Sequence, residues 1–254
     1  MEAYTDFAQV YDELMDETPY EKWSQNITNV LAEYDICDGL VLELGCGTGS
    51  ITELLAAKGY DMIGVDASEE MLNIANNKRI ESGHDILYLN QDMRTFELYG
   101  TVRAVISVCD SLNYLLEDED IIECFKLVNN YLDPKGIFFF DFNTRYKYEN
   151  VIGNTVIAEN RDDCSFIWEN YYDPEEMINE YDLTIFVKED DEDEDIFRRF
   201  QEVHYQRGYT LDEMKAFIEK AGLVFIKAYD ADTLGDVTAE SERIYCVAQE
   251  LGKN

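Results

Sequence analysis

Apolar residues between positions 40 and 142 form short runs that alternate with stretches of helical spacing. The runs cover 40–44, 62–65, 86–89, 104–108 and 137–142. Between them, apolar residues recur every three or four positions over 51–57, 71–78 and 121–132. Short continuous apolar runs are typical of strands buried on both faces, and strands that alternate with helices form parallel sheets. The pattern predicts an α/β fold whose sheet is covered by helices on both sides.

The carboxy-terminal part of the chain returns to this alternation. Thr210 is predicted to cap a helix that stops at Gly222. Two apolar runs follow, over 223–229 and 244–249, with no helical spacing between them. Because strands joined without a helix pair antiparallel, we expect a mostly parallel seven-stranded sheet with an antiparallel carboxy-terminal strand.

The segment from 154 to 207 has a different pattern. Helical spacing disappears, and β-rich runs cover 155–158, 165–172, 178–187 and 196–205. Polar and acidic turns separate the runs, so the segment is predicted to be an antiparallel meander inserted into the α/β domain. The seven consecutive acids at 189–195 are interpreted as a solvated hairpin tip, with a cation-binding loop as the alternative.

The first 35 residues are helical and aromatic in character. Residues at spacings of three and four share one predicted helix face: Tyr4, Phe7, Ala8, Tyr11, Leu14 and Met15. Pro19 is expected to begin a second helix, because proline lacks the N–H group that would be unbonded at that position.

Charge and composition disfavour several classes of partner. The chain has 254 residues, with 55 acidic against 20 basic residues and a formal net charge of -35. This charge disfavours nucleic acids and anionic membranes. No apolar stretch approaches the roughly 20 residues of a membrane span and no secretory leader is recognisable, so we expect a cytoplasmic protein. Six cysteines without a Cys-x-x-Cys pair, and two histidines, predict reduced thiols and no metal site.

The strongest chemical signal lies at positions 41–49, where an apolar strand runs into three alternating glycines and then a helix. Glycines let a ligand approach the backbone, and the helix amino terminus offers free N–H groups. A tight turn without a ligand is the alternative. The spacing of Gly45, Gly47 and Gly49 differs from the Gly-x-Gly-x-x-Gly of dinucleotide sites. Glu43 suits a ligand with an ammonium and a sulfonium better than a pyrophosphate.

Two further acids follow the next two strands. Asp66 ends the second apolar run, where a carboxylate can accept both hydroxyls of a ribose. Asp92 follows the third run, where it can accept from the exocyclic amine of an adenine. A single acid after a strand also serves NAD enzymes or ordinary turns. Together with the glycine loop, the two positions outline one adenosyl ligand across neighbouring strand ends.

These residues resemble the class I S-adenosylmethionine-dependent methyltransferases. Residues 43–49 match the first motif of that family, 65–68 match its ribose-binding motif, and Asp92 matches its adenine-contacting acid. The turn at 132–137 is similar to the family's entry into the fifth strand. The resemblance implies a Rossmann-like methyltransferase fold with S-adenosylmethionine as cofactor. It implies cofactor contacts from Glu43, Gly45, Cys46, Gly47, Gly49, Asp66, Ala67, Met71, Asp92, Met93 and Asp110.

A narrower similarity links the chain to small bacterial methyltransferases that open with a segment such as Tyr4, Phe7, Ala8, Tyr11 and Asp12. In those proteins, amino-terminal helices close over the cofactor and an inserted sheet covers the acceptor pocket. The resemblance implies a helical lid at 1–35, a Rossmann-like cofactor domain at 36–150 and 208–254, and a covering β subdomain at 151–207. It also implies cofactor or pocket contacts from Tyr11 and Trp23, with simple packing of these aromatics as the alternative.

The segment after the fourth strand is expected to lie beside the transferable methyl group. Its Asp110, Asn113 and Tyr114 are candidates for positioning the cofactor and the acceptor. Methyl transfer from a sulfonium is an in-line displacement that needs alignment and exclusion of water, whereas a base is optional. Where a proton must leave an alcohol or a protonated amine, the catalytic candidates are Asp110, Tyr114 and His204.

His204 shares a predicted strand face with Glu202 and Gln206, and a merely solvated face is the alternative. The sequence thus predicts methyl transfer to an N or O atom of a small-molecule acceptor, and leaves the oligomeric state open. An NAD-dependent oxidoreductase is the alternative enzyme, disfavoured by the glycine spacing and Glu43. A non-catalytic regulator that binds S-adenosylmethionine is the alternative from another class.

Overall fold

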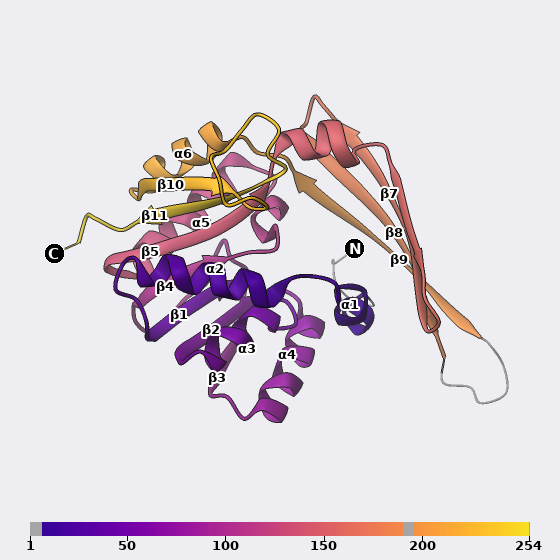
Figure 1. Cartoon of the computed structure of the whole chain (residues 1–254), viewed down its shortest axis with the longest axis horizontal. Helices are drawn as coiled ribbons and strands as arrows, with labels where there is room; N and C mark the ends of the chain where they lie inside the picture. Colours follow the sequence, from indigo (N-terminus) through magenta and orange to yellow (C-terminus); the bar gives the residue numbers. More distant parts are fainter. Residues whose placement is uncertain (1–6, 190–195, 254) are drawn as a thin grey trace.

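The computed structural model describes residues 7–189 and 196–253, and two β-sheets organise them (Figure 1). The larger sheet has seven strands in the order β10-β11-β5-β4-β1-β2-β3. Its strands are β1 (Gly39–Leu44), β2 (Tyr60–Asp66), β3 (Ile86–Asn90), β4 (Val102–Ser107), β5 (Leu132–Asn143), β10 (Val224–Asp230) and β11 (Arg243–Gln249). Strand β11 pairs antiparallel with both of its neighbours, and the other pairs are parallel. The predicted fold class is confirmed.

Helices cover both faces of this sheet, because its strands are apolar on both faces. The helices are α2 (Tyr20–Ala32), α3 (Ser50–Ala57), α4 (Glu69–Ser82), α5 (Asp118–Tyr131) and α6 (Leu211–Lys220). Helices α5 and α6 pack on one face, whereas α2 and α3 pack on the other. In β5, Phe138 and Phe140 point to the first face and Ile137 and Phe139 to the second. Successive side chains of this one strand therefore pack into two separate hydrophobic cores.

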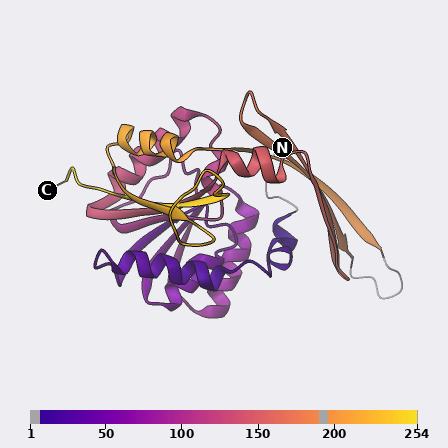
Figure 2. The ribbon, with the colours of Figure 1, turned by 45° about the horizontal axis from the view of Figure 1, so that its top comes forward.

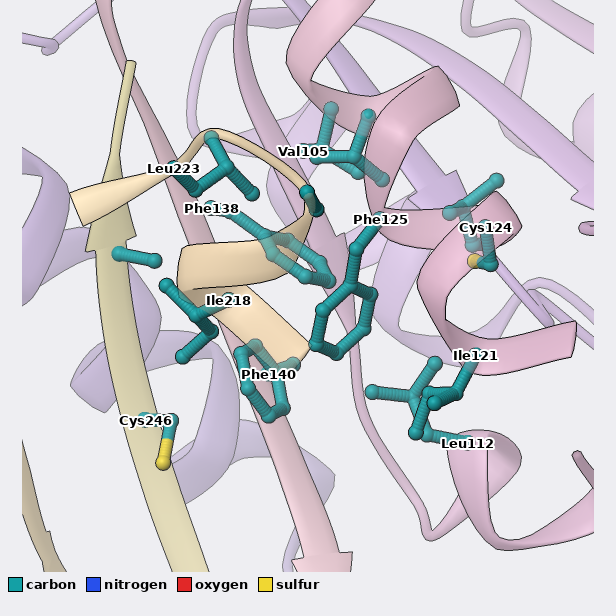
Figure 3. Close-up of a cluster of buried hydrophobic side chains, with 14 of the residues drawn as sticks. Val105, Leu112, Ile121, Cys124, Phe125, Phe138, Phe140, Ile218, Leu223 and Cys246 are labelled. Atoms are coloured by element: carbon teal, nitrogen blue, oxygen red, sulfur yellow. The ribbon is translucent and has the colours of Figure 1, made fainter. Parts of the chain in front are cut away.

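Three phenylalanines pack together among aliphatic side chains in the core beneath α5 (Figure 3). The Phe125 ring lies with its centroid 5.1 Å from that of Phe138 and 5.2 Å from that of Phe140. All three side chains are fully buried. Truncating one such phenylalanine to alanine typically costs about 3–5 kcal/mol of stability. Close packing in this core supports the strands whose ends line the site.

The predicted start of α6 is confirmed in detail. The Thr210 hydroxyl accepts a hydrogen bond from the backbone N–H of Glu213, and the Glu213 carboxylate accepts one from the backbone N–H of Thr210. Such a capping box satisfies two backbone donors that a helix leaves unbonded at its amino terminus. The helix ends before Gly222, which has a left-handed backbone with φ +80°.

The second sheet is the predicted antiparallel meander between β5 and α6. It has the order β6-β7-β8-β9, and its strands are β6 (Val156–Asn160), β7 (Cys164–Asp173), β8 (Ile178–Lys188) and β9 (Phe197–Arg207). A short helix, η2 (Lys147–Ile152), leads into it. The sheet projects from one side of the larger sheet (Figure 1). Most of the predicted acidic tip, at 190–195, lies outside the described residues.

Helix α1 (Ala8–Leu14) lies between the two sheets in both ribbon views (Figures 1 and 2). Its Val10 joins a small core with Leu183 and Ile185 of the inserted sheet. Pro19 immediately precedes α2, as predicted, whereas Tyr4 lies outside the described residues. Among the helices of the described ranges, none is long and apolar enough to cross a membrane.

Candidate active site

A cavity of about 660 Å³ opens at the carboxyl ends of β1, β2, β3 and β4. Parallel strands place their carboxyl ends at one edge of the sheet, where open α/β sheets bind ligands. The volume falls in the range of about 300–1,000 Å³ that is usual for small-molecule sites. The loops after all four strands contribute to its walls.

The glycine loop after β1 forms the floor of this cavity. Gly45 has φ +69°, and a Cβ atom there would lie 2.5 Å from the Cβ and Oγ of Ser111 in the loop after β4. Gly47 has φ +53°, and a Cβ atom there would meet nothing within 4 Å. Gly45 therefore permits close contact between two loops, whereas Gly47 leaves open space that a ligand can fill.

Glu43 is a buried carboxyl group beside the glycine loop. Its side chain accepts a hydrogen bond from the Thr52 hydroxyl, and the residue is 2% exposed. Burial raises the pKa of Glu43 to about 8, although the Thr52 bond acts in the opposite direction. A cationic ligand in the cavity would stabilise the ionised carboxylate and lower that pKa again.

Asp66 and Asp92 continue the row of acids along the strand ends. Asp66 accepts backbone N–H bonds from Gly47 at 2.8 Å and from Ser68 at 2.9 Å. Burial raises the pKa of Asp66, and those backbone bonds lower it. Asp92 is paired with Arg94, whose hydrogen bonds lower the pKa of Asp92. All three predicted acids thus line one cavity.

The amino-terminal helices supply the wall opposite the strand ends. Tyr11 and Tyr20 line the cavity and share a hydrogen bond, and burial raises the pKa of both phenols. Asp12 accepts a hydrogen bond from the Thr48 hydroxyl at 2.6 Å and pairs with Lys78 of α4 at 2.7 Å. Helix α1 is therefore held against the glycine loop by a hydrogen bond and against α4 by an ion pair.

Tyr114 lies at the end of the short helix η1 (Ser111–Tyr114) and lines the cavity. Its hydroxyl is 3.0 Å from Nδ1 of His204 on β9. The other ring nitrogen of His204, Nε2, is 3.2 Å from Oε2 of Glu202, and both side chains are 4% exposed. A phenol at the cavity surface is thus backed by a buried imidazole and a buried carboxylate.

The loop between β4 and η1 is held in an unusual conformation. Cys109 and Asp110 both have a left-handed backbone, with φ +63° and +51°. Their N–H groups donate to the buried carboxylate of Asp141, at 3.1 and 2.8 Å. The Asp110 carboxylate accepts from Arg243 at 2.7 Å and from Gln206 at 2.7 Å. These hydrogen bonds hold the loop from several sides, so its strained backbone conformation is maintained.

Comparisons with known proteins agree on one family. A family model described as a methyltransferase domain matches residues 41–136. The chain is 37% identical over 248 residues to YqeM of Bacillus subtilis (strain 168), a protein named as a methyltransferase, with 97% of each chain covered. It is 30% identical to a solved S-adenosylmethionine-dependent methyltransferase of Clostridium acetobutylicum, with a TM-score of 0.87 and coverage of 99% and 100%. The chain belongs to the S-adenosylmethionine-dependent methyltransferases.

This membership decides against the NAD-dependent oxidoreductase, and the cofactor of this methyltransferase is S-adenosylmethionine. The fold extends to more distant methyltransferases. The sugar N-methyltransferase KedS8 of a Streptoalloteichus species has a TM-score of 0.75 at 15% identity, with 93% of this chain and 92% of that chain covered.

Most of the predicted cofactor residues of the methyltransferase surround the cavity. Those that line it are Tyr11, Glu43, Gly45, Cys46, Gly47, Asp66, Ala67, Met71, Asp92 and Met93. Among the described lining residues, Gly49, Trp23 and Asp110 are absent. Gly49 instead caps α3, and the Trp23 ring lies over the Arg243 guanidinium, with 4.9 Å between the ring centroid and Cζ. Their roles as contacts stay predictions.

The remaining candidates of the methyltransferase lie where the cavity meets the inserted sheet. His204, Glu202 and Gln206 share one face of β9, as predicted, and that face is buried. Asn113 is fully buried and bonds the backbone of Asn143, so its position is that of a scaffold for the loop. The catalytic roles of Asp110, Tyr114 and His204 stay predictions.

Sequence reasoning missed several residues of the site. Thr48 stands within the glycine motif and so carried a local signal, but its bond to Asp12 depends on a helix 36 positions away. Arg243 meets Asp110 across 133 positions and belongs to no motif. Contacts of this kind arise from packing between distant elements, which local patterns do not encode.

Proposed function

We propose that the protein transfers a methyl group from S-adenosylmethionine to a nitrogen or oxygen atom of a small-molecule acceptor by in-line displacement. One observation carries the proposal: Glu43, Asp66 and Tyr114 line the same cavity. Glu43 and Asp66 suit the cofactor, and Tyr114 presents a hydroxyl to the same cavity from the end of η1. Donor and acceptor would therefore meet in one enclosed space.

The cofactor side fits S-adenosylmethionine on its own chemistry. When bound, the cofactor supplies a methyl group on a sulfonium, which is a good neutral leaving group. Gly47 leaves room for close approach, and Glu43 offers a buried carboxylate that a cation would stabilise. Asp66 would accept from ribose hydroxyls, because a carboxylate has lone pairs beyond those used by Gly47 and Ser68.

The acceptor side favours a small molecule. Tyr11 and Tyr20 line the cavity from the amino-terminal helices, so α1 and α2 limit access to it. The net charge of -35 disfavours a nucleic-acid acceptor. KedS8, whose name describes a sugar N-methyltransferase, supports nitrogen as one of the two possible acceptor atoms. Tyr114 and His204 are proposed to receive a proton, whereas Asp110 is proposed to orient the loop through Arg243.

Isothermal titration with S-adenosylhomocysteine tests the proposal, with Asp66→Ala as the variant. Asp61→Ala is the matched control, because Asp61 lies on the same strand with an exposed side chain. We expect saturable binding by wild type and Asp61→Ala and its loss in Asp66→Ala. A folded wild-type protein that fails to bind would overturn the cofactor site. A labelled methyl donor with metabolite pools then tests turnover, and binding without any labelled product would favour a non-catalytic regulator.

A further inference from the structure

We infer that Glu202 is a positioning residue of a proton relay through His204 and Tyr114, and that Phe7, the residue before α1 and here the amino-terminal segment, completes this relay by holding Glu202. The inference rests on the proposed function and deepens it, since it assigns the route by which the acceptor loses its proton. It depends on three contacts that link β9, η1 and the segment before α1.

The first two contacts place His204 between an acid and a phenol. Nδ1 of His204 is 3.0 Å from the Tyr114 hydroxyl, and Nε2 is 3.2 Å from Oε2 of Glu202. The Nε2 contact lies at ion-pair distance and lacks hydrogen-bond geometry. The negative charge of the carboxylate still attracts an N–H group and repels a nitrogen lone pair, so it favours the neutral tautomer that carries its proton on Nε2. In that tautomer Nδ1 accepts the hydrogen bond of the Tyr114 hydroxyl.

Burial makes the Glu202 carboxylate costly unless it has partners. Residues at 202, 204 and 206 form the buried face of β9, and Glu202 itself is 3% exposed. An isolated buried carboxylate is strongly disfavoured, whereas a hydrogen-bonded and charge-paired one is tolerated. A carboxylate at this buried position therefore needs contacts that stabilise it, and His204 supplies one of them.

The third contact comes from the amino-terminal segment. The backbone N–H of Phe7 donates to Oε1 of Glu202 at 2.9 Å, across 195 positions of the chain. The Phe7 ring also packs edge-on against the His204 ring, with centroids 6.4 Å apart. Because Asp12 fixes α1 to the glycine loop, docking of α1 and orientation of Glu202 occur together. The relay is complete when the cofactor side is covered and water is excluded.

The relay accounts for the proton that the acceptor loses during methyl transfer. The acceptor X–H gives its proton to the Tyr114 oxygen while Tyr114 gives its own proton to Nδ1 of His204. With S-adenosylmethionine bound, the freed lone pair of X would form the X–C bond while the S–C bonding pair returned to sulfur, so that a neutral thioether would leave. The resulting imidazolium lies beside the Glu202 carboxylate. After product release, the proton returns through Tyr114 to water in the cavity.

The Glu202→Gln variant tests the role of Glu202, because it is expected to change the tautomer of His204. A glutamine oxygen can still accept from the Phe7 N–H, but its amide then presents a donor to His204. The preferred tautomer therefore reverses: Nε2 becomes the acceptor and Nδ1 carries the proton. In that state Nδ1 cannot accept from Tyr114, so the relay is blocked although shape and packing are retained.

Nitrogen-15 NMR of histidine-labelled full-length protein with S-adenosylhomocysteine reads the tautomer directly. The chain has two histidines, so His84→Gln assigns the signals. We expect the proton of His204 on Nε2 in wild type and on Nδ1 in Glu202→Gln. Glu202→Asp, which keeps the charge, and Glu180→Gln on the neighbouring strand should both retain the wild-type tautomer. A proton on Nδ1 in wild type, or no change in Glu202→Gln, would overturn the inference.

The contribution of the amino-terminal segment is tested in the same spectra. Phe7 has φ -61°, which suits proline, so Phe7→Pro removes the N–H donor, whereas Phe7→Ala removes only the ring. We expect a mixture of tautomers in Phe7→Pro and a single one in Phe7→Ala. Identical spectra would contradict the coupling to α1.

Titration of S-adenosylhomocysteine into each variant separates this inference from the proposed function. Failure of the wild type to bind would reject the cofactor site, whatever the tautomer. Normal binding with an unchanged tautomer would reject the relay alone. With an acceptor in hand, Glu202→Gln should lower kcat by about 10²-fold with little change in KM, and Glu202→Asp should restore most of it.

Discussion

The two sides of the cavity are built in different ways. On the proposed cofactor side, Glu43 and Asp66 stand at the ends of adjacent parallel strands, so the sheet itself brings them together. On the proposed acceptor side, Tyr114 meets His204 across 90 positions and Phe7 meets Glu202 across 195. The first side follows from strand order, whereas the second needs three separate elements to pack correctly. An insertion can therefore change the acceptor side and leave the cofactor side intact.

The largest expected effect separates the two sides by kinetics. Tyr114→Phe keeps the ring but removes the hydroxyl that lies 3.0 Å from His204. We expect methyl transfer to slow by about 10²–10⁴-fold, the usual contribution of a positioned proton acceptor. The affinity for S-adenosylhomocysteine should stay within about twofold, since the hydroxyl contacts the inserted sheet. Initial rates and calorimetric titration measure the two quantities.

Tyr205→Phe is the matched control for this variant, because Tyr205 lies on the same strand as His204 and is 45% exposed. Its rate and affinity should equal those of wild type. A loss of cofactor affinity in Tyr114→Phe as large as the loss of rate would show that the two sides do not act separately.

Gly45 lies where the loop after β1 touches the loop after β4, so its substitution tests the contact between the two sides. Its backbone is left-handed, and a Cβ atom there would lie 2.5 Å from Ser111. Gly45→Ala should lower the free energy of unfolding by about 2–5 kcal/mol, from backbone strain and overpacking together. Gly47→Ala meets no such neighbour and should lose only the strain, about 1–2 kcal/mol. Urea denaturation compares them, and equal losses would mean that contact between the loops contributes nothing.

The pH dependence of stability tests the burial of Glu43. Its pKa is raised from 4.5 to about 8, so between these values the folded protein keeps a proton that the unfolded chain has lost. The folded state binds more protons in that window, and stability should therefore fall as pH rises through it, by a few kcal/mol at most. Glu43→Gln should abolish this fall while keeping an acceptor for Thr52.

Binding of S-adenosylmethionine should show the opposite trend, because its cationic groups stabilise the ionised carboxylate. Affinity should rise with pH up to about 8 in wild type and rise less in Glu43→Gln. Calorimetry in buffers of different ionisation enthalpy measures the proton released. An unchanged pH profile of stability in Glu43→Gln would place the titrating group elsewhere.

The cofactor side was largely predictable from sequence. The apolar runs gave the strands to within two residues, except that β5 begins at Leu132, five residues before its predicted start, since the predicted turn at 132–137 is part of the strand. A strand followed by glycines or an acid places these residues at one edge of the sheet. Hairpin turns and alternation predicted the inserted sheet in the same way. Both signals are local: they depend on neighbours along the chain, as does the capping box of Thr210 and Glu213.

The acceptor side was predictable only in part. Period two placed His204 and Glu202 on one face of a strand, but that pattern does not say what the face packs against. The contacts of His204 with Tyr114, and of Trp23 with Arg243, join elements far apart in sequence. Trp23 was predicted to contact the cofactor or pocket, or simply to pack; its ring packs over the Arg243 guanidinium, and its role as a contact stays a prediction. Long-range pairing is decided by the whole packed structure, which a single sequence does not display.

The smallest expected effect concerns α1, which touches both sides. Asp12 joins it to the proposed cofactor side through Lys78 and Thr48. Asp16, two residues after its end, pairs at 3.0 Å with Arg161 in the turn between β6 and β7 of the inserted sheet. Partly exposed ion pairs contribute about 0–1 kcal/mol. Asp12→Asn should therefore weaken S-adenosylhomocysteine binding by up to about fivefold, and Asp16→Asn should leave it unchanged.

Calorimetric titration of both variants, at low and high salt, measures this difference. The effect of Asp12→Asn should shrink as salt screens the pair with Lys78. Equal losses in the two variants would mean that α1 responds as a unit to either contact, so that the inserted sheet influences cofactor binding through it. In that case the two sides of the cavity, although built separately, would be thermodynamically linked by one short helix.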